Sequence, residues 1–388
     1  MKRSELNDLI KEAGVYPNAH QLLLLKSALY PPAEAFAYFE LWLNQLKGIH
    51  ISKSASTKPG LPQVFDQLDL GSQRLLSLLY SNLKSYRTSY PILEQLSGYY
   101  KYVWYKNQLL NSTLTALGKE ISSSNINLIA LKGIAHINQF YGDFGSRPTV
   151  DIDVAVQRKD VKSLVSLLNR SGWRSVSGDI NRIESSMFHA HSFKRKGLEL
   201  DVHIRFSLYA LKQATEYLMW ERAIASDNTI KYLSPPDELY CVLLHGMQWN
   251  LVPPIRWVAD SVKIIEGLTD DQWVMLKELI RSENYQTPID MLRYLNENEF
   301  ARIPSEILNM PDISESKLLQ NQYRFSLVPR EDNDMIMARR VFYRTLYKNN
   351  GNYLKTLKDW FSHYLYSRNK KYIIQLIFEL IRLQFKRS

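Results

Sequence analysis

Cysteine is almost absent from this chain of 388 residues, in which Cys241 is the single example. One thiol excludes an internal disulfide and is typical of proteins in a reducing compartment. No run of about 18 apolar residues occurs, so no segment is expected to span a membrane. The first residues also lack the apolar core of a secretory signal. We therefore expect a cytoplasmic protein with no disulfide partner.

Excess positive charge is missing from residues 1–335, although the whole chain carries a net charge of +10. Residues 336–388 contain 12 Lys and Arg against 2 Asp and Glu, and they account for the entire excess. The end of this tail predicts a mostly apolar helix, which usually packs into the protein. Its basic ends would also suit an RNA backbone or an anionic membrane surface. The charge therefore predicts an anionic partner for the tail and does not bear on an active site.

The spacing of apolar residues predicts an α+β chain that is mostly helical. Apolar residues recur every three or four positions through most of the first 120 residues, apart from an expected loop at 52–62. From 125 to 153 the pattern changes to strand, helix and strand. Helical patterns return after 235, and 303–335 is poorer in pattern and is expected to be a connection.

Asp151 and Asp153, separated by one residue, are the strongest sign of chemistry. Alternate residues of a strand share a face, so both carboxylates project to one side, where they can hold a divalent cation. Upstream, an apolar run meets Lys132 and Gly133, and a short helix and a loop carrying Arg147 follow. Strand, glycine turn, helix, loop and carboxylate strand form a site for a metal-bound polyphosphate. This order predicts phosphoryl or nucleotidyl transfer.

Two-metal nucleotidyl transfer needs three carboxylates, since Mg²⁺ prefers oxygen ligands. The third is expected from a neighbouring strand. A hairpin is predicted where two segments flank Lys196-Gly197, and its second arm alternates apolar and polar residues. Asp201 lies on the polar face of that arm, where a sheet can bring it beside Asp151. Glu199 has the same parity and is the reserve.

Each of these residues also has a structural interpretation. An Asp-x-Asp pair in a surface strand is often only solvated, and Lys132 can be an ordinary loop lysine. Arg147 can pair with Asp143 or Asp151. His203, on the same face as the third carboxylate, can orient a carboxylate or the substrate, or it can make a structural hydrogen bond. The combination of these residues, rather than any one of them, favours a site.

A wider pattern links these residues. The chain contains LIALKG, then R-x-x-x-DIDV, then ELDVH, and later a helix with LLH and the segment RWVAD. This combination resembles the uncharacterised nucleotidyltransferase family of the polymerase-β-like superfamily, over about residues 70–270. The resemblance implies a small mixed sheet with flanking helices. On this basis we expect four regions. They are a helical region 1–120, the α/β nucleotidyltransferase core 121–235, a helical region 236–300 that completes the cleft, and a basic helical region 301–388.

The resemblance also implies roles for individual residues. The implied site residues are Asp151, Asp153 and Asp201 for metal binding and catalysis, and Lys132, Gly133, Arg147 and His203 for the nucleotide. The metal would be Mg²⁺, with Mn²⁺ as the alternative. Lys132 and Arg147 would neutralise triphosphate charge, and Asp201 would help to deprotonate the acceptor. An NTP would donate NMP to an acceptor hydroxyl or phosphate that the sequence does not identify, and pyrophosphate would leave.

The chain departs from the superfamily at one turn. Where the superfamily has a Gly-Ser pair before its carboxylates, this chain has Lys132-Gly133. A lysine replaces the hydroxyl with a point charge, and the helix N-terminus after Gly133 still offers amides to a phosphate. Two other functions stay open: a non-catalytic nucleotide-binding or scaffold protein, and an RNA-directed enzyme resembling toxin-type transferases that modify tRNA ends. In the latter, the basic tail would contact RNA phosphates.

The helical region after 235 contains further polar residues. His245 lies in an apolar segment, where a buried, hydrogen-bonded side chain is the expected arrangement. Arg256 and Asp260 are spaced to form an i,i+4 pair on a helix. The family resemblance gives the alternative that the His245 helix, Arg256, Trp257 and Asp260 line a nucleotide cleft.

Overall fold

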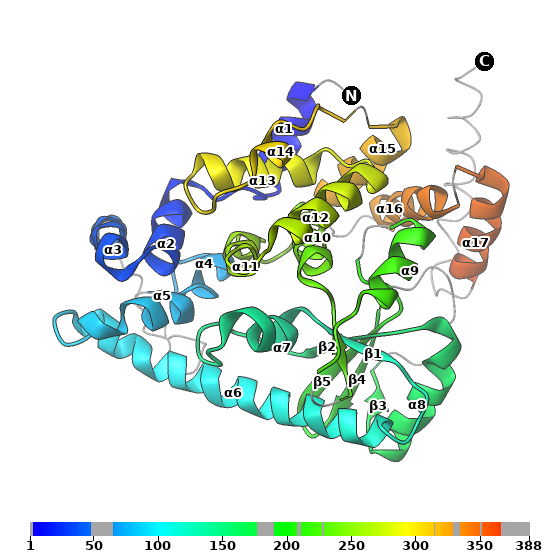
Figure 1. Ribbon diagram of the computed structural model, residues 1–388, viewed down its shortest axis with the longest axis horizontal. Helices are drawn as coiled ribbons and strands as arrows, with labels where there is room; N and C mark the ends of the chain where they lie inside the picture. The colour runs from blue at the N-terminus through cyan, green and yellow to red at the C-terminus, as the bar shows by residue number, and fades with distance from the viewer. Residues whose placement is uncertain are drawn as a thin grey trace.

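The computed structural model describes residues 3–47, 65–176, 190–207, 211–226, 229–313, 315–328, 334–349 and 351–365. The predicted loop at 52–62 and the predicted basic helix at the end of the chain lie outside these residues. The chain is α+β and mostly helical, as predicted, with one mixed sheet at one side of the molecule (Figure 1). Within the described residues, no helix combines the length and hydropathy needed to cross a bilayer.

Six strands form the sheet, in the order β3-β4-β5-β2-β1-β6. Their bounds are β1 Leu128–Leu131, β2 Ile152–Val156, β3 Arg174–Ser175, β4 Ala190–Arg195, β5 Leu198–His203 and β6 Lys231–Tyr232. β2 is antiparallel to β1 and parallel to β5, and β4 and β5 form the predicted hairpin. Lys196 and Gly197 connect the hairpin with φ of 49° and 78°, the left-handed conformation that a tight two-residue turn requires.

β1 and β2 are buried along their whole length. Apolar residues on one face of these strands join a core that includes the C-terminal half of α6 (Pro91–Ile121) and α8 (Val161–Arg170). Ile129, Leu131 and Ala155, on the other face, join the core of the helical regions. Asp153 is the one charged residue of β2 and is only 8% exposed. A carboxylate in such a strand requires a charged partner or a ligand, because desolvation of an unpaired charge is costly.

The N-terminal helices confirm the predicted periodicity. They are α1 Arg3–Glu12, α2 Ala19–Leu29, α3 Pro32–Lys47, α4 Leu70–Gln73, α5 Leu76–Leu83, the 3₁₀ turn η2 Lys84–Tyr86, and α6. Asn18 and Gln21 form a capping box at the start of α2, and Pro91 begins α6. The long helix α6 runs from the other N-terminal helices to the sheet (Figure 1), so it contributes buried residues to both the helical core and the sheet core.

Helices also follow β1 and make up most of the chain after β5. They are α7 Lys132–His136, the π-helical turn η3 Ile137–Tyr141, the 3₁₀ turn η4 Arg158–Asp160, α8, α9 Gln213–Glu221, α10 Pro235–Gly246, α11 Arg256–Ile265, α12 Asp270–Glu283, α13 Thr287–Glu297, α14 Ser305–Leu308, α15 Lys317–Leu327, α16 Asp334–Lys348 and α17 Tyr353–Leu365. The prediction of a connection over 303–335 was wrong for α14 and α15. Leu319, Tyr323 and Leu327 of α15 are buried at four-residue spacing, a helical signal within that segment.

The N-terminal helices and the helices after the sheet share one hydrophobic core. Trp257 of α11 donates from Nε1 to the carbonyl of Val15, at 2.8 Å, and ties the two parts together. A Cβ on Gly71 of α4 would lie 2.6 Å from the carbonyl oxygen of Pro253, so this glycine permits close packing between α4 and the segment before α11. Regions distant in sequence therefore meet beside the sheet. The predicted region boundaries stay a prediction.

Candidate functional site

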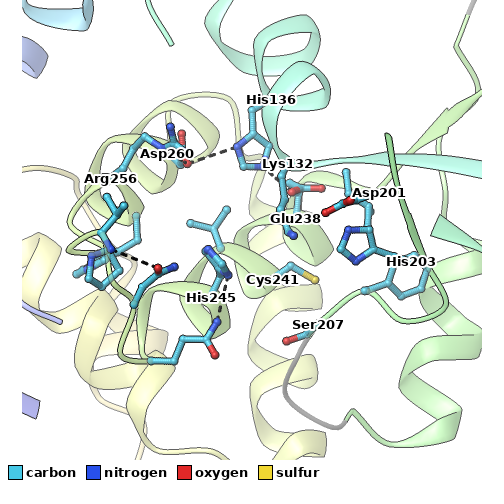
Figure 2. A pocket seen from close by; sticks show the side chains of 18 of the residues that line it. Lys132, His136, Asp201, His203, Ser207, Glu238, Cys241, His245, Arg256 and Asp260 are labelled. Carbon is cyan, nitrogen blue, oxygen red and sulfur yellow. Dashed lines mark hydrogen bonds and ion pairs between the residues drawn. The ribbon is translucent and has the colours of Figure 1, made fainter. Parts of the chain in front are cut away.

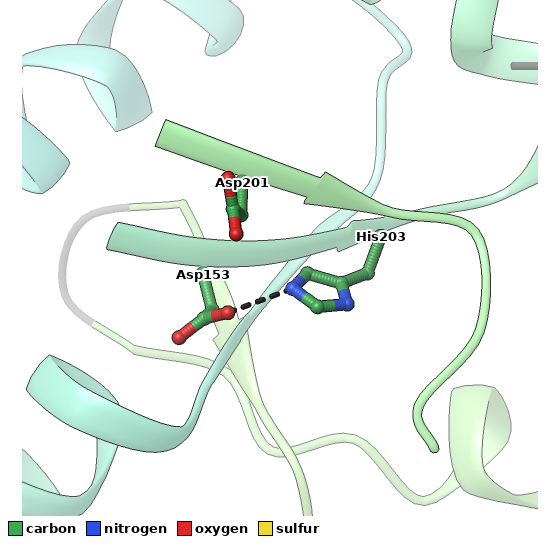
Figure 3. Close-up of side chains that lie close together, drawn as sticks. All are labelled: Asp153, Asp201 and His203. Carbon is green, nitrogen blue, oxygen red and sulfur yellow. Dashed lines mark hydrogen bonds and ion pairs between the residues drawn. The ribbon is translucent and has the colours of Figure 1, made fainter. Parts of the chain in front are cut away.

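An acidic cluster lies on β2 and β5. Asp153 pairs in register with Asp201, and His203 follows two residues later on the same strand face (Figure 3). One ligand atom from each of these three residues lies within 4.8 Å of the others. The sequence predicted Asp201 beside Asp151, but the register places it opposite Asp153. Glu199, the reserve, instead pairs with Lys194 across the hairpin at 2.5 Å.

Asp153 is the most strongly held member of the cluster. Its Oδ1 accepts a hydrogen bond from Nε2 of His203 at 2.7 Å and lies 3.3 Å from Nζ of Lys132. Burial opposes its charge, but Lys132 and His203 keep the pKa of this carboxyl well below its usual range. Burial and the charge of Lys132 lower the pKa of His203, so a neutral imidazole donates to Asp153.

Asp151 lies at the bend directly before β2 and is half-buried. Burial and the charges of Asp153 and Asp201 raise its pKa to about 6, against the opposing effect of Lys132. Three carboxylates therefore repel one another in a small volume. A divalent cation between them would relieve this repulsion. The repulsion among the carboxylates is therefore the observation that a bound metal would fit.

Lys132 and Gly133 directly follow β1 and form a non-helical turn at the start of α7. Lys132 has φ of 47°, and its Nζ points toward the cluster. Burial opposes its charge, but Asp153, Asp151 and Asp201 raise the pKa of its ammonium group. A Cβ on Gly133 would lie 2.5 Å from Cγ2 of Thr149, so the turn packs directly against the loop that precedes β2.

The contacts of Arg147 favour a structural role for this residue. Its Nε and Nη2 contact the two carboxylate oxygens of Asp260 at 2.7 and 2.8 Å, and the side chain is 3% exposed. The partner is neither Asp143 nor Asp151, the two that the sequence indicated. Asp143 accepts hydrogen bonds from Ser81 and other groups. The pair fixes the loop before β2 against α11, and it leaves little of the guanidinium for a phosphate.

His136 and Glu238 extend this buried network, and sequence reasoning missed both. Nε2 of His136 is 2.5 Å from Oε1 of Glu238, and its Nδ1 is 3.6 Å from Oδ2 of Asp260. Burial opposes the charge of His136, but these two carboxylates raise its pKa. Each residue had a local signal: His136 follows Lys132 by one helical turn, and Glu238 follows the Pro-Pro-Asp start of α10.

A pocket of about 330 Å³ is lined by Asp201 and His203 on one side and by Arg256 and Asp260 on the other (Figure 2). Its volume is in the range of small-molecule sites. Its charged residues are Arg74, Lys132, Arg147, Asp201, Glu238, Arg256 and Asp260, and its walls include Leu131, Phe206, Leu233, Val242 and Trp257. A charged ligand with an apolar or aromatic part would suit this lining.

The profile of the uncharacterised nucleotidyltransferase family matches residues 70–300. The chain belongs to this family. The matched range begins at α4, includes the whole sheet and continues through α10 and α11. It therefore includes the pocket residues from Arg74 to Asp260. No curated protein matches the chain.

In this member of the family, the prediction that His245 is buried was wrong. Its side chain is exposed within the pocket, and its Nδ1 contacts Nε2 of Gln248 at 3.2 Å (Figure 2). The enclosing walls and the charges of Lys132 and Arg256 lower the pKa of His245 to about 3. The imidazole is therefore neutral near pH 7.

The residues named by the alternative that the resemblance implies do line this pocket, and their role in a nucleotide cleft stays a prediction. His245 of α10 lines the pocket, and so do Arg256, Trp257 and Asp260 of α11. Arg256 also donates from Nη1 to the carbonyl of Pro148 at 2.9 Å, and its Nε lies 3.8 Å from Asp260. The i,i+4 pair therefore exists, but it faces the pocket and holds the loop that leads into β2.

Proposed function

We propose that this protein is a Mg²⁺-dependent nucleotidyltransferase, with Mn²⁺ as an alternative metal. It transfers NMP from an NTP to a hydroxyl or phosphate of an acceptor and releases pyrophosphate. The observation that carries the proposal is the pairing of Asp153 with Asp201, which lines the pocket, beside the ammonium group of Lys132. Asp151, directly before β2, is close enough for both of these charges to act on it. Family membership supports the same reaction class.

The cluster residues have separate tasks in this reaction. Asp151, Asp153 and Asp201 hold the metal, which supplies Lewis-acid stabilisation to phosphate oxygens when bound. His203 orients Asp153 through the 2.7 Å hydrogen bond, and Lys132 adds fixed positive charge next to the phosphates. Asp201 takes the proton of the acceptor. The acceptor oxygen then forms a bond to the α-phosphorus as the bond to pyrophosphate breaks.

A labelling experiment with a matched control tests the proposal. The protein is incubated with each α-³²P-labelled NTP, Mg²⁺ and a cell extract, and transfer of label is compared between wild type, Asp201→Asn and Glu199→Gln. Glu199 lies on the same strand as Asp201, but its carboxylate forms a surface pair with Lys194. We expect wild type and Glu199→Gln to transfer label equally, and Asp201→Asn to lose at least a hundredfold, as for loss of one main electrostatic group.

Two results would contradict the proposal. One is label transfer by Asp201→Asn at the wild-type rate, which would place the chemistry outside the cluster. The other is no transfer by wild type with any of the nucleotides and either metal. That result, together with retained NTP binding, would favour the non-catalytic nucleotide-binding alternative.

A further inference from the structure

The pocket contains a second charged region, away from Asp201 and His203. Three guanidinium groups line it, those of Arg74, Arg147 and Arg256. Asp260 is the carboxylate among them: it forms the bidentate pair with Arg147 and lies 3.8 Å from Arg256. This region therefore has more positive than negative charge, even though residues 1–335 are neutral overall.

Arg74 differs from the other two arginines. Across the described part of the chain, its guanidinium has neither a hydrogen bond nor an ion pair, although the side chain is half-buried. Burial and the nearby charge of Arg147 lower its pKa, whereas Asp151 has the opposite effect. A half-buried guanidinium beside two others, with no counter-ion of its own, is a favourable place for an anion.

The fold holds Arg74 in this place. Arg74 directly follows the short helix α4, whose first turn is capped by Asp69 through a 2.9 Å hydrogen bond from the amide of Ser72. Gly71 packs α4 against Pro253, which itself lines the pocket. The helical N-terminal part of the chain thus adds a cation to a pocket built mainly by the sheet, α10 and α11.

We propose that Arg74, together with Arg256, binds the β- and γ-phosphates of the nucleotide donor and so takes the task that the sequence indicated for Arg147. This inference rests on the proposed function. Arg74 and Asp201 line the same pocket, so phosphates held by Arg74 share that pocket with the metal cluster. The α-phosphate then remains beside Asp153 and Asp201, as transfer requires.

The test uses inorganic tripolyphosphate without metal, with binding to the full chain measured by calorimetry. The variants are Arg74→Gln and, as a matched control, Arg281→Gln, which removes an arginine from an exposed pair with Glu278 on α12. Because the Arg74 guanidinium has no hydrogen bond or ion pair in the described residues, its replacement breaks neither there. We expect Arg74→Gln to weaken tripolyphosphate binding about tenfold, the effect of one charge-assisted contact, and Arg281→Gln to have no effect.

A competition experiment tests whether the bound anion is the donor's own tail. Tripolyphosphate should displace a metal-free NTP from wild type, because both occupy Arg74 and Arg256. Equal tripolyphosphate affinity of Arg74→Gln and wild type, or simultaneous binding of NTP and tripolyphosphate, would overturn the inference. This readout needs neither metal nor turnover. The two proposals can therefore fail separately. If Arg74→Gln loses anion binding but wild type transfers no label, the proposed reaction is refuted and the proposed phosphate subsite still stands.

Discussion

Arg147 and Asp260 lie 113 residues apart in the chain and form a buried bidentate ion pair, with Nε–Oδ1 and Nη2–Oδ2 distances of 2.7 and 2.8 Å. One residue belongs to the loop that leads into β2, and the other to α11. The pair therefore couples the position of the carboxylate strand to the helix that forms the opposite pocket wall. The arginine four residues before Asp151 is therefore a structural anchor.

Removal of the Asp260 carboxylate should strongly destabilise the protein. Asp260→Asn leaves Arg147 buried without a counter-charge, and breaking a buried pair in this way costs about 3–5 kcal/mol. Urea denaturation at pH 7 measures the change in the free energy of unfolding. As a control, Asp312→Asn breaks an exposed pair with Arg293 at 3.1 Å and should cost less than about 1 kcal/mol. Equal stability of the two variants would show that Arg147 does not depend on Asp260.

Stability should also fall at alkaline pH because of His136. The carboxylates of Glu238 and Asp260 raise its pKa above the ordinary value of 6.5, against burial and the charge of Arg147. A raised pKa means that the charged ring stabilises the folded state below pH 6.5 and that this contribution is lost as pH rises through the folded value. Wild type should therefore lose free energy of unfolding relative to His136→Asn as pH rises above 6.5 and through the folded pKa of His136. Parallel curves for the two proteins in urea denaturation would contradict this assignment.

The parts of the site that sequence predicts best depend on local periodicity. Alternation in 198–206 and the Lys196-Gly197 turn predict the hairpin, because strand side chains alternate and the turn type follows from its residues. The same parity places Asp201 and His203 on one face. The register between β2 and β5 is not local, since the paired Asp153 and Asp201 lie 48 positions apart in the chain. This is why the sequence did not show that Asp153, rather than Asp151, is the partner of Asp201.

The missed features depend on the packing of distant elements. No local pattern shows that α11 docks on the loop before β2, so the partner of Arg147 could not be read from neighbouring residues. An apolar helix segment predicts burial for His245, but a pocket beside the helix leaves that side chain accessible. Arg74 resembles any helix-surface arginine in sequence, and it reaches the pocket through long-range packing such as that of Gly71 against Pro253.

Gly133 should tolerate no side chain while Thr149 keeps its methyl group. In Gly133→Ala, the added Cβ would lie 2.5 Å from Cγ2 of Thr149, so the loop before β2 must shift. Overpacking of this kind costs about 1–3 kcal/mol. Thr149→Ser removes Cγ2, and the remaining Thr149 atoms are 3.4 Å or more from the new Cβ. The double variant should therefore recover part of the lost free energy of unfolding, as measured by urea denaturation. If the effects of the two substitutions simply add, the strain lies in the backbone instead.

Metal binding should be measurable apart from catalysis, because the metal should stabilise wild type much more than Asp201→Asn. Without metal, Asp201→Asn should be as stable as wild type or more stable, because it removes a charge that raises the pKa of Asp151. With Mg²⁺ or Mn²⁺ at a hundred times its Kd, wild type should gain about 2.7 kcal/mol. Asp201→Asn should lose most of that gain, and Glu199→Gln should keep it. Thermal unfolding across a metal titration distinguishes these cases, and an equal rise in Tm for all three proteins would place the cation outside the cluster.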